Sequence, residues 1–259
     1  MGKVVAISNQ KGGVGKTTTS VNLASSLIEL GKRVCLVDID YQANATTNLG
    51  VNRSNLKYSS ADIFMTQAAV KDVIVHIPHL SMDVIPAKFD LSNVEEALIA
   101  DDNKNFILSN ALESVKDEYD YVIIDCPPSL GLITTNALIA ADSVLIPVQC
   151  EFLAMDGLTQ LLNTIRYIQN KKQYSAKKLV IEGVLLTMLD TRSNIGYEII
   201  SEIKTYFREK VFKTIIPRNV KVAVSSSYGL PVTEFSPRSK GSVSYKNLAK
   251  ELVENNEQI

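Results

Sequence analysis

The stretch Lys11-Gly12-Gly13-Val14-Gly15-Lys16-Thr17-Thr18 decides the fold of this chain. The apolar run Val4–Ser8 precedes it and the amphipathic pattern Lys16–Leu30 follows it, so a strand, a glycine-rich turn and a helix succeed one another. Glycine allows a turn in which backbone N–H groups converge on phosphate oxygens, and the positive end of the helix dipole adds to their attraction. The sequence therefore predicts a phosphate-binding loop, in which Lys16 contacts the β- and γ-phosphates of a nucleotide and Thr17 supplies a hydroxyl to Mg²⁺.

The loop departs from the standard phosphate-loop pattern at its first position. That pattern has glycine where this chain has Gln10, and Lys11 adds a second cation at the start of the loop. The strand, the spacing and the helix all agree with phosphate binding, which makes a chance glycine-rich turn a poor alternative. The expected nucleotide-binding residues of the loop are Lys11, Gly12, Gly13, Val14, Gly15, Lys16, Thr17 and Thr18.

Acidic residues follow two of the apolar runs. Asp38 closes the run Val34–Asp38 with Asp40 just beyond it, and Asp125 closes the run Tyr121–Asp125. Open α/β sheets bind ligands at the carboxyl ends of their strands, where a carboxylate can position an attacking water or hold Mg²⁺. A single aspartate at a strand end is commonly a turn or cap residue. Two such acids behind one phosphate loop favour a functional site, with Asp125 in the place of the metal-side acid of nucleotide hydrolases.

The whole chain alternates between strand and helix patterns. Near-continuous apolar runs are typical of strands buried on both faces of a parallel sheet, and alternation with helices indicates repeated βαβ units. We expect a doubly wound, mostly parallel α/β sheet flanked by helices, in a single domain over residues 1–259. The expected strands are Val4–Ser8, Val34–Asp38, Met82–Pro86, Tyr121–Asp125, Ser143–Val148, Leu179–Leu186 and Val211–Ile215. The expected helices are Lys16–Leu30, Asn103–Val115, Leu130–Ala140, Met155–Gln169, Asn194–Arg208 and Ser244–Asn255.

Composition excludes several classes of protein. The three cysteines are few and far apart, which argues against a disulfide framework and for a reducing cytoplasm. No CxxC pair accompanies the two histidines, so we expect no structural zinc site. The apolar runs are too short to span a membrane, and the first residues lack the pattern of a signal peptide.

Charge divides the chain into two unlike halves. Residues 1–150 carry 11 Lys and Arg against 17 Asp and Glu, a balance of −6, whereas residues 151–259 carry 16 against 11, a balance of +5. The basic half indicates either a face that meets an anionic partner or an ordinary solvated surface, and charge alone does not separate the two.

Together these segments resemble the ParA/Soj family of chromosome- and plasmid-partition ATPases, within the deviant phosphate-loop proteins that include MinD. The resemblance covers nearly the whole chain, and its later motifs separate the family from MinD-like and nitrogenase-reductase-like proteins. The matching stretches are 11–18, Asp38-Ile39-Asp40-Tyr41-Gln42-Ala43-Asn44-Ala45-Thr46, Ile124-Asp125-Cys126-Pro127-Pro128-Ser129-Leu130-Gly131, Pro147-Val148-Gln149-Cys150-Glu151, Glu182 to Asp190 and Ile216-Pro217-Arg218-Asn219-Val220.

The resemblance implies roles for individual residues. Lys11 looks like the family's signature lysine, which reaches the phosphates of the partner subunit in a nucleotide-sandwich dimer, and Gly12 would allow the subunits to approach. Lys16 and Thr17 look like the ligands of phosphate and Mg²⁺, and Asp40 like the residue that orients the hydrolytic water. Asp125 is similar to the acid that supports the metal, and Pro217 and Asn219 resemble the segment that packs on adenine.

The resemblance also implies a cycle and partners. ATP would hold two chains together, the dimer would bind double-stranded DNA without sequence preference, and slow hydrolysis, stimulated by a ParB-like protein, would release it. Arg192 occupies the position of a family arginine that contacts DNA. The other DNA-binding candidates are the basic residues Arg218, Lys221 and Lys246, with Arg238 and Lys240 beside them. A cytoplasmic, nucleoid-associated protein without stable membrane association is expected.

Two segments depart from the family pattern. Relatives begin the turn after Asp40 with Pro-Gln-Gly, where this chain has Tyr41-Gln42-Ala43, and after Asn219-Val220 they read Arg-Leu-Ser-Glu-Ala-Pro-Ser, where it has residues 221–227. Whether the role is chromosomal or plasmid-borne stays open.

The alternative functions are less well supported by the sequence. A MinD-like membrane-cycling ATPase would need a basic, bulky amphipathic C-terminal helix, whereas this C-terminus is acidic and lacks aromatic residues. An iron–sulfur carrier would need CxxC, a ligase a substrate-binding insertion and a tyrosine kinase a tyrosine cluster. A non-catalytic DNA-binding module would not need Lys16, Thr17 and Asp40.

Overall fold

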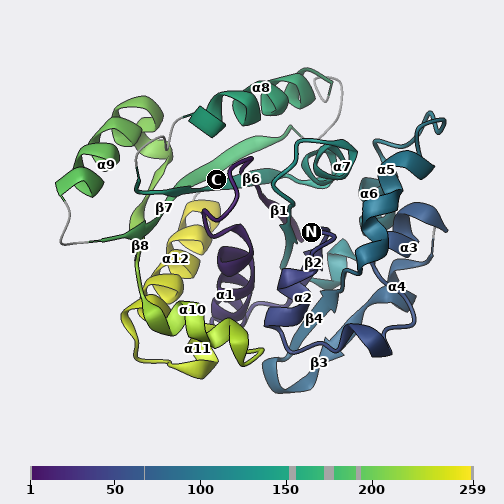
Figure 1. Ribbon diagram of the computed structural model, residues 1–259, viewed down its shortest axis with the longest axis horizontal. Coiled ribbons are helices and arrows are strands. Elements are labelled where there is room, and N and C mark those ends of the chain that lie inside the picture. Colours follow the sequence, from purple (N-terminus) through teal and green to yellow (C-terminus); the bar gives the residue numbers. More distant parts are fainter. Residues whose placement is uncertain (1, 67, 152–155, 172–177, 191–193, 258–259) are drawn as a thin grey trace.

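Apolar runs along the chain form eight strands that pair in one sheet, in the order β3-β4-β2-β5-β1-β6-β7-β8 (Figure 1). The computed structural model describes residues 2–66, 68–151, 156–171, 178–190 and 194–257. The strands are β1 Lys3–Ile7, β2 Val34–Asp38, β3 Val75–Ile77, β4 Met82–Ile85, β5 Tyr121–Asp125, β6 Ser143–Gln149, β7 Val180–Leu189 and β8 Val211–Pro217.

The register of the central strands brings three functional segments to one edge of the sheet. β5 pairs in parallel with both β1 and β2, and places Asp125 opposite Ile7 on one side and opposite Asp38 on the other. The loop after β1 therefore starts beside the acids that end β2 and β5. β1 lies inside the sheet, with β5, β2, β4 and β3 on one side of it and β6, β7 and β8 on the other. The point where the chain passes from one side to the other is a switch point, and doubly wound sheets bind ligands there.

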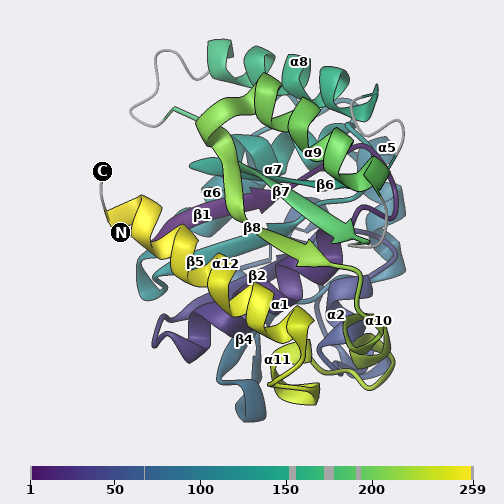
Figure 2. The ribbon, with the colours of Figure 1, turned by 90° about the vertical axis from the view of Figure 1, so that its left-hand side faces the viewer.

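Helices cover both faces of the sheet. Figures 1 and 2 show α1 and α12 side by side on one face, while α7, α8 and α9 lie on the other. The helices are α1 Lys16–Glu29, α2 Asn44–Asn48, α3 Ser60–Met65, α4 Val70–Val73, α5 Val94–Ala97, α6 Ile107–Glu113, α7 Leu132–Ala140, α8 Asp156–Lys171, α9 Asn194–Phe207, α10 Val220–Ser227, α11 Val232–Phe235 and α12 Lys240–Glu257.

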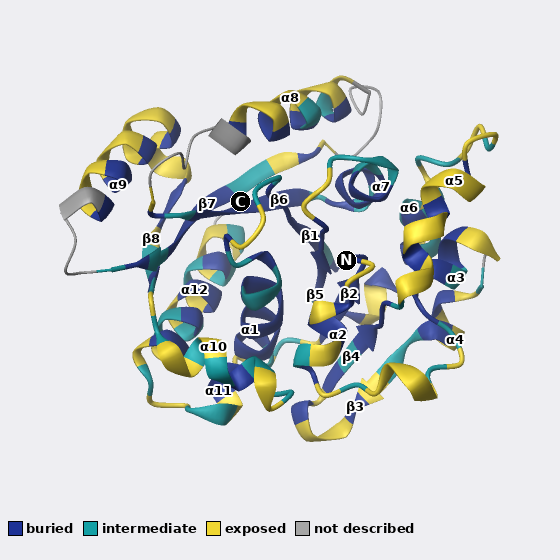
Figure 3. Cartoon of the chain, viewed as in Figure 1, coloured by how far each residue is buried: buried dark blue, intermediate teal, exposed yellow. Residues whose placement is uncertain are grey.

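Each face of the sheet has its own apolar core, because successive side chains of a strand point to opposite sides. In β1, Val5 and Ile7 pack into the core under α1 and α12, together with Leu27 and Leu248. Val4 and Ala6 of the same strand pack into the other core. Burial is therefore continuous through the sheet, and exposure is concentrated on the outward faces of the helices (Figure 3).

The predicted fold class is confirmed, and each of the seven predicted strands is present. The eighth strand, β3, was not predicted. It has only three residues and pairs antiparallel with β4, and the exposed His76 interrupts its apolar pattern. Such a short edge strand gives almost no periodic signal.

The helix predictions were incomplete, because the short helices α2, α3, α4, α5, α10 and α11 were not predicted and one predicted helix is shorter than expected. The expected helix Asn103–Val115 is shortened to α6, because the side chain of Asn136 accepts a hydrogen bond from the Leu108 N–H (3.2 Å) and donates one to the Lys104 carbonyl (2.7 Å). The unpredicted α10 is rich in valine and serine, which are poor helix formers, but Asn219 caps it through the Lys221 N–H (2.8 Å).

Among the residues that the structure describes, no helix is both long enough and apolar enough to cross a membrane.

Candidate functional site

The loop between β1 and α1 is shaped by glycines in the left-handed region. Gly13 has φ +77° and Gly15 has φ +90°, and α1 begins immediately after Gly15. Residues other than glycine adopt these backbone angles only with strain. Gly12 differs, since its φ is ordinary and no described atom lies within 4 Å of the place where a Cβ would stand. The loop thus presents the first-turn N–H groups of α1 at an open surface, as an anion site requires.

Hydrogen bonds from neighbouring strands hold the loop in place. Asn9 accepts from the Lys11 N–H (3.0 Å) and donates to the Pro147 carbonyl at the end of β6 (2.7 Å). The hydroxyl of Thr187 on β7 donates to the Val14 carbonyl (2.8 Å). Because three strands fix its backbone, the loop is preorganised for a ligand.

The carboxylate of Asp125 lies beneath the start of α1. It is fully buried and accepts hydrogen bonds from the hydroxyls of Thr17 and Ser20, both at 2.8 Å. The buried ammonium of Lys16 donates to the Lys11 carbonyl (3.1 Å), which keeps it inside the curve of the loop.

The two acids at the end of β2, Asp38 and Asp40, have different contacts. Asp38 is buried and accepts from the N–H and the hydroxyl of Thr46 in α2 (2.8 and 2.7 Å), so it fixes α2 against the sheet. Asp40 accepts from the Gln42 N–H (3.0 Å) and lines the cleft in front of the loop. Only Asp40 is therefore placed to act on a ligand.

Negative charge exceeds positive charge in this buried cluster. Burial raises the pKa of the Asp125 carboxyl, and the neighbouring Asp38 raises it further. Burial also raises the pKa of Asp38, against the hydrogen bonds from Thr46. Burial lowers the pKa of Lys16, while Asp125 and Asp40 raise it. Three carboxylates and one ammonium leave a deficit of positive charge, which a bound cation would relieve.

A cleft of about 320 Å³ joins the loop to the acids. Its lining residues are Gly12, Gly13, Gly15, Lys16, Thr17, Thr18, Asp40, Tyr41, Gln42, Asn44, Pro128 and Met188. The structure thus brings together most of the predicted loop residues with Asp40, and Asp125 lies directly behind Thr17.

The donors at the cleft suit Mg²⁺. The Thr17 hydroxyl and the Asp125 and Asp40 carboxylates are hard oxygen donors. Within the described ranges, no group of three or more His, Cys, Asp or Glu side chains could hold a metal alone. Mg²⁺ is commonly held by one or two carboxylates together with waters and phosphate oxygens, which the Thr17, Asp40 and Asp125 donors would complement.

Other predicted binding residues lie outside the cleft lining. Val14 is buried under the loop, and Lys11 is half-buried at its start. Pro217 is the last residue of β8, and the N–H of the next residue, Arg218, donates to the Leu189 carbonyl at the end of β7 (2.9 Å). The ends of β7 and β8 therefore lie side by side, next to the cleft residue Met188. The side-chain oxygen of Asn219 caps α10.

The predicted DNA-binding residues differ in whether a carboxylate already pairs with them. Arg192 lies outside the described residues. Arg218 pairs with Glu151 (2.7 Å) and Lys246 pairs with Glu29 (2.8 Å). Lys221 is exposed, with its ammonium 5.9 Å from the Phe235 ring centroid. Of Arg218, Lys221 and Lys246, only Lys221 has no carboxylate partner among the described residues.

Several site residues were not found from sequence. Ser20 and Thr46 hold the acids, Thr187 holds the loop and Met188 lines the cleft. Ser20 stands one helical turn after Lys16 and so shares its face of α1. Thr46, Thr187 and Met188 lie in stretches that resemble the family, but nothing in those stretches predicted their contacts.

The turn after Asp40 has a left-handed residue at Ala43. Ala43 adopts the left-handed conformation that favours glycine (φ +53°) and its methyl group is buried. Tyr41, which replaces the proline of relatives, lines the cleft and packs edge-on against Phe89, with ring centroids 6.1 Å apart.

Replacing Asp125 with asparagine is expected to stabilise the nucleotide-free chain. The neutral amide removes a buried charge from a cluster with excess carboxylates, which should raise the free energy of unfolding at neutral pH by about 1–3 kcal/mol. Urea unfolding would measure the change. Asp120→Asn, at an exposed residue paired with Arg33, is the control and should change stability by less than about 1 kcal/mol. A less stable Asp125→Asn chain would contradict the charge balance described above.

Comparison with known proteins places this geometry in a family. Residues 2–181 match a family model described as an AAA domain. The sporulation initiation inhibitor protein Soj of Bacillus subtilis is 53% identical over 98% of this chain and 100% of its own length. The chromosome partitioning protein ParA of Myxococcus xanthus is 45% identical over 98% of this chain and 88% of its own.

A solved structure agrees with the sequence comparisons. The structure described as cobyrinic acid a,c-diamide synthase from Mycobacterium smegmatis with bound ADP and magnesium superposes with a TM-score of 0.86. It is 33% identical to this chain, and the match covers 99% of this chain and 96% of the other. With its phosphate-type loop, its strand-end acids and these relatives, the chain belongs to the ParA/Soj family of chromosome-partitioning proteins.

Proposed function

We propose that this chain is an ATP-hydrolysing switch for DNA segregation. In this cycle the chain dimerises when ATP binds, the dimer binds DNA without sequence preference, and hydrolysis releases the DNA. The observation that carries the proposal is the cleft in which Lys16, Thr17 and Asp40 face one another, in a chain 53% identical to Soj. ATP and Mg²⁺ are the expected ligands, in keeping with the ADP and magnesium bound to the structural relative.

Each residue of the cleft has a part in the proposed reaction. The N–H groups of the loop and Lys16 bind the phosphates, and Thr17, backed by Asp125, reaches the Mg²⁺ that neutralises phosphate charge. Asp40 orients the attacking water. Basal turnover is slow in this scheme, because the contacts that stabilise the transition state are completed only by a partner, which we expect to be ParB-like.

Lys11 is proposed to complete the site of a second chain. It is half-buried at the loop start rather than in the cleft lining of its own chain, and the space over the neighbouring Gly12 is open. A lysine donated between subunits acts only while ATP holds the dimer, so nucleotide state becomes assembly state.

Mixing two inactive variants tests this arrangement. Lys11→Ala and Asp40→Ala chains should each be inactive. A mixed dimer, however, has one site with its own Asp40 and the partner's lysine intact. Random assortment should then restore about a quarter of wild-type turnover, measured by phosphate release. Asp40→Ala mixed with Asp125→Asn is the control without recovery, because both residues serve the same site. No recovery in the first mixture would place Lys11 in its own subunit's site and refute the proposal.

DNA binding is tested at Lys221, an exposed candidate without a described carboxylate partner. Lys221→Ala should weaken non-specific DNA binding about threefold to tenfold and flatten its salt dependence, because phosphate contacts release counterions. Lys246→Ala is the matched control with a smaller effect, since Glu29 already pairs with that ammonium. Fluorescence anisotropy with ATP at several salt concentrations gives both quantities. Equal effects of the two changes would remove Lys221 from the DNA surface.

A membrane-cycling role is disfavoured by the C-terminal helix. The apolar residues Tyr245, Leu248 and Leu252 of α12 are buried against α1 and the sheet, so they are not free to enter a bilayer. Nucleoid association follows from the proposed DNA binding.

A further inference from the structure

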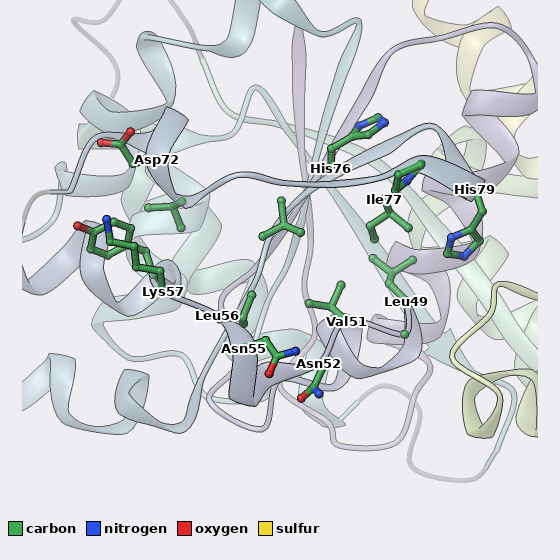
Figure 4. Close-up of a pocket in the computed structure, with 15 residues that line it drawn as sticks. Leu49, Val51, Asn52, Asn55, Leu56, Lys57, Asp72, His76, Ile77 and His79 are labelled. Carbon is green, nitrogen blue, oxygen red and sulfur yellow. The ribbon is translucent and has the colours of Figure 1, made fainter.

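The cavity beside β3, of about 430 Å³, offers no net charge that would select a ligand (Figure 4). Among its lining residues the ammonium of Lys57 and the carboxylate of Asp72 cancel. Leu49 and Ile77, both drawn in Figure 4, belong to the core under α1 and α12. A feature that does point to a ligand lies instead in the wall of the nucleotide cleft, near the end of β7.

Met188 has a backbone conformation that residues other than glycine adopt only with strain. Its φ is +54°, in the left-handed region. Of the described non-glycine residues with such an angle, Met188 is the one that lines the nucleotide cleft within the last turn of a strand, and the others are Ala43, Ser81 and Arg208. Strain of this kind persists where the surrounding structure holds it, and it is concentrated at ligand sites. The conformation of Met188 therefore indicates a functional role.

An extra residue in β7 turns Met188 out of the sheet. Leu186 pairs with Ile215 and Leu189 with Pro217, so β7 advances by three residues where β8 advances by two. Leu186 and Leu189 also pack into the same core, although residues three apart in a regular strand point to opposite faces. A bulge of this kind re-aims a side chain, and here it directs Met188 into the cleft.

Hydrogen bonds on both sides of Met188 hold the bulge in place. The Thr187 hydroxyl donates to the Val14 carbonyl (2.8 Å), and the Thr187 carbonyl accepts from the Cys150 N–H (3.0 Å). On the other side, the Leu189 carbonyl accepts from the N–H of the residue after β8 (2.9 Å). The neighbouring segments therefore fix the backbone of Met188, so that a ligand meets it already in place.

Met188 and the acids lie on opposite sides of the phosphate loop. β7 and β2 stand on opposite sides of β1 in the sheet, so Asp40 borders the cleft from one side and Met188 from the other. The Cε atom of Met188 is 3.6 Å from the place where a Cβ would stand on Gly15, which sets the thioether beside the last glycine of the loop. A nucleotide whose terminal phosphate lies at Asp40 would have its nucleoside on the Met188 side.

We propose that Met188 is a binding residue for the nucleoside end of ATP and ADP, against which its thioether packs. A thioether is flexible and polarisable, and it makes favourable contacts with aromatic rings such as a purine. The side chain of Met188 has no charge and no hydrogen-bond donor for the phosphates, which distinguishes its role from that of Lys16. This role rests on the proposed function, because it takes the terminal phosphate to lie beside Asp40.

Methyl NMR of the full-length chain with ADP and Mg²⁺ tests the contact directly. Labelling of the methionine methyl groups gives a signal for Met188, which is assigned by its loss in Met188→Leu. With ADP this signal should move upfield, as expected for a methyl group over a purine ring, and show nuclear Overhauser effects to base or ribose protons. The signal of Met65, which is exposed on α3 and outside the cleft, is the internal control and should not move.

Matched variants measure how much the contact contributes. Glycine adopts φ +54° without strain, so Met188→Gly should remain folded, which thermal unfolding checks. Calorimetry should show ADP binding about threefold to tenfold weaker in Met188→Gly, whereas inorganic tripolyphosphate, which has no nucleoside, should bind as it does to wild type. Thr187→Val removes the hydroxyl that holds the loop and should weaken both ligands alike.

Three results would overturn the proposal: no nuclear Overhauser effect between Met188 and bound ADP, unchanged ADP affinity in Met188→Gly, or an equal loss of affinity for ADP and tripolyphosphate. The last of these would make Met188, like Thr187, a support of the loop. A wild-type chain that binds no ADP would refute the proposed function itself and this role with it.

Discussion

Lys16→Ala is expected to abolish both ATP hydrolysis and the ATP-dependent dimer. Lys16 is buried inside the loop and lines the cleft, and it is the one cation among the three carboxylates described there. Without it the loop meets the phosphates with N–H dipoles alone, and the acids behind the loop repel them. Removing one preorganised electrostatic contact of this kind commonly lowers turnover about 10²–10³-fold.

Two measurements separate the effects of Lys16→Ala. Phosphate release gives turnover, and sedimentation with and without ATP gives the dimer. Lys213→Ala, an exposed lysine on β8, is the control and should behave as wild type in both. Since alanine leaves a cavity at a buried position, Lys16→Met, which keeps the length of the side chain, serves if the first variant unfolds. A Lys16 variant that is folded and still dimerises with ATP would refute the switch.

Asp40→Ala should have a different outcome, in which turnover is lost and the ATP-bound dimer persists. Asp40 lines the cleft and its carboxylate accepts a single described hydrogen bond, from the Gln42 N–H, so its removal disturbs little else. Loss of the group that orients the attacking water should lower turnover about 10²–10³-fold while phosphate binding through the loop remains.

The neighbouring Asp38 is the control for this second prediction. It is bound to Thr46 and fixes α2, so Asp38→Ala, which leaves the Thr46 donors without their acceptor, should lower the free energy of unfolding by about 1–3 kcal/mol, whereas Asp40→Ala should change it by less than about 1 kcal/mol. Sedimentation with ATP, phosphate release and urea unfolding of both variants decide the matter. Normal turnover in Asp40→Ala would remove Asp40 from catalysis.

Much of the fold could be predicted because its signals are local. The strands are near-continuous apolar runs, and the loop is marked by glycines between a strand and a helix. The failures arise where side-chain hydrogen bonds, some of them distant in sequence, override intrinsic helix preference. Asn136 sets the start of α6, and Asn219 starts a helix in a segment that composition alone would leave irregular.

The site divides in the same way. Lys16, Thr17 and Asp40 could be found because their chemistry is tied to the loop and to strand ends. Thr187 could not, because a threonine in an apolar strand is unremarkable until the fold brings β7 beside the Val14 carbonyl. Ala43 shows that a departure from a sequence pattern need not change the backbone conformation. A residue that departs from glycine still adopts the left-handed turn, since burial of its methyl group offsets part of the strain.

The open space at Gly12 affects which substitutions at this position can be retained in evolution. Within the described chain no atom lies within 4 Å of the place where a Cβ would stand, and its φ lies outside the left-handed region. The fold of the monomer therefore leaves room for a side chain at this position. If two chains meet there, a side chain at Gly12 also meets the neighbouring molecule, and substitutions are filtered by assembly as well as by the nucleotide cleft that Gly12 lines.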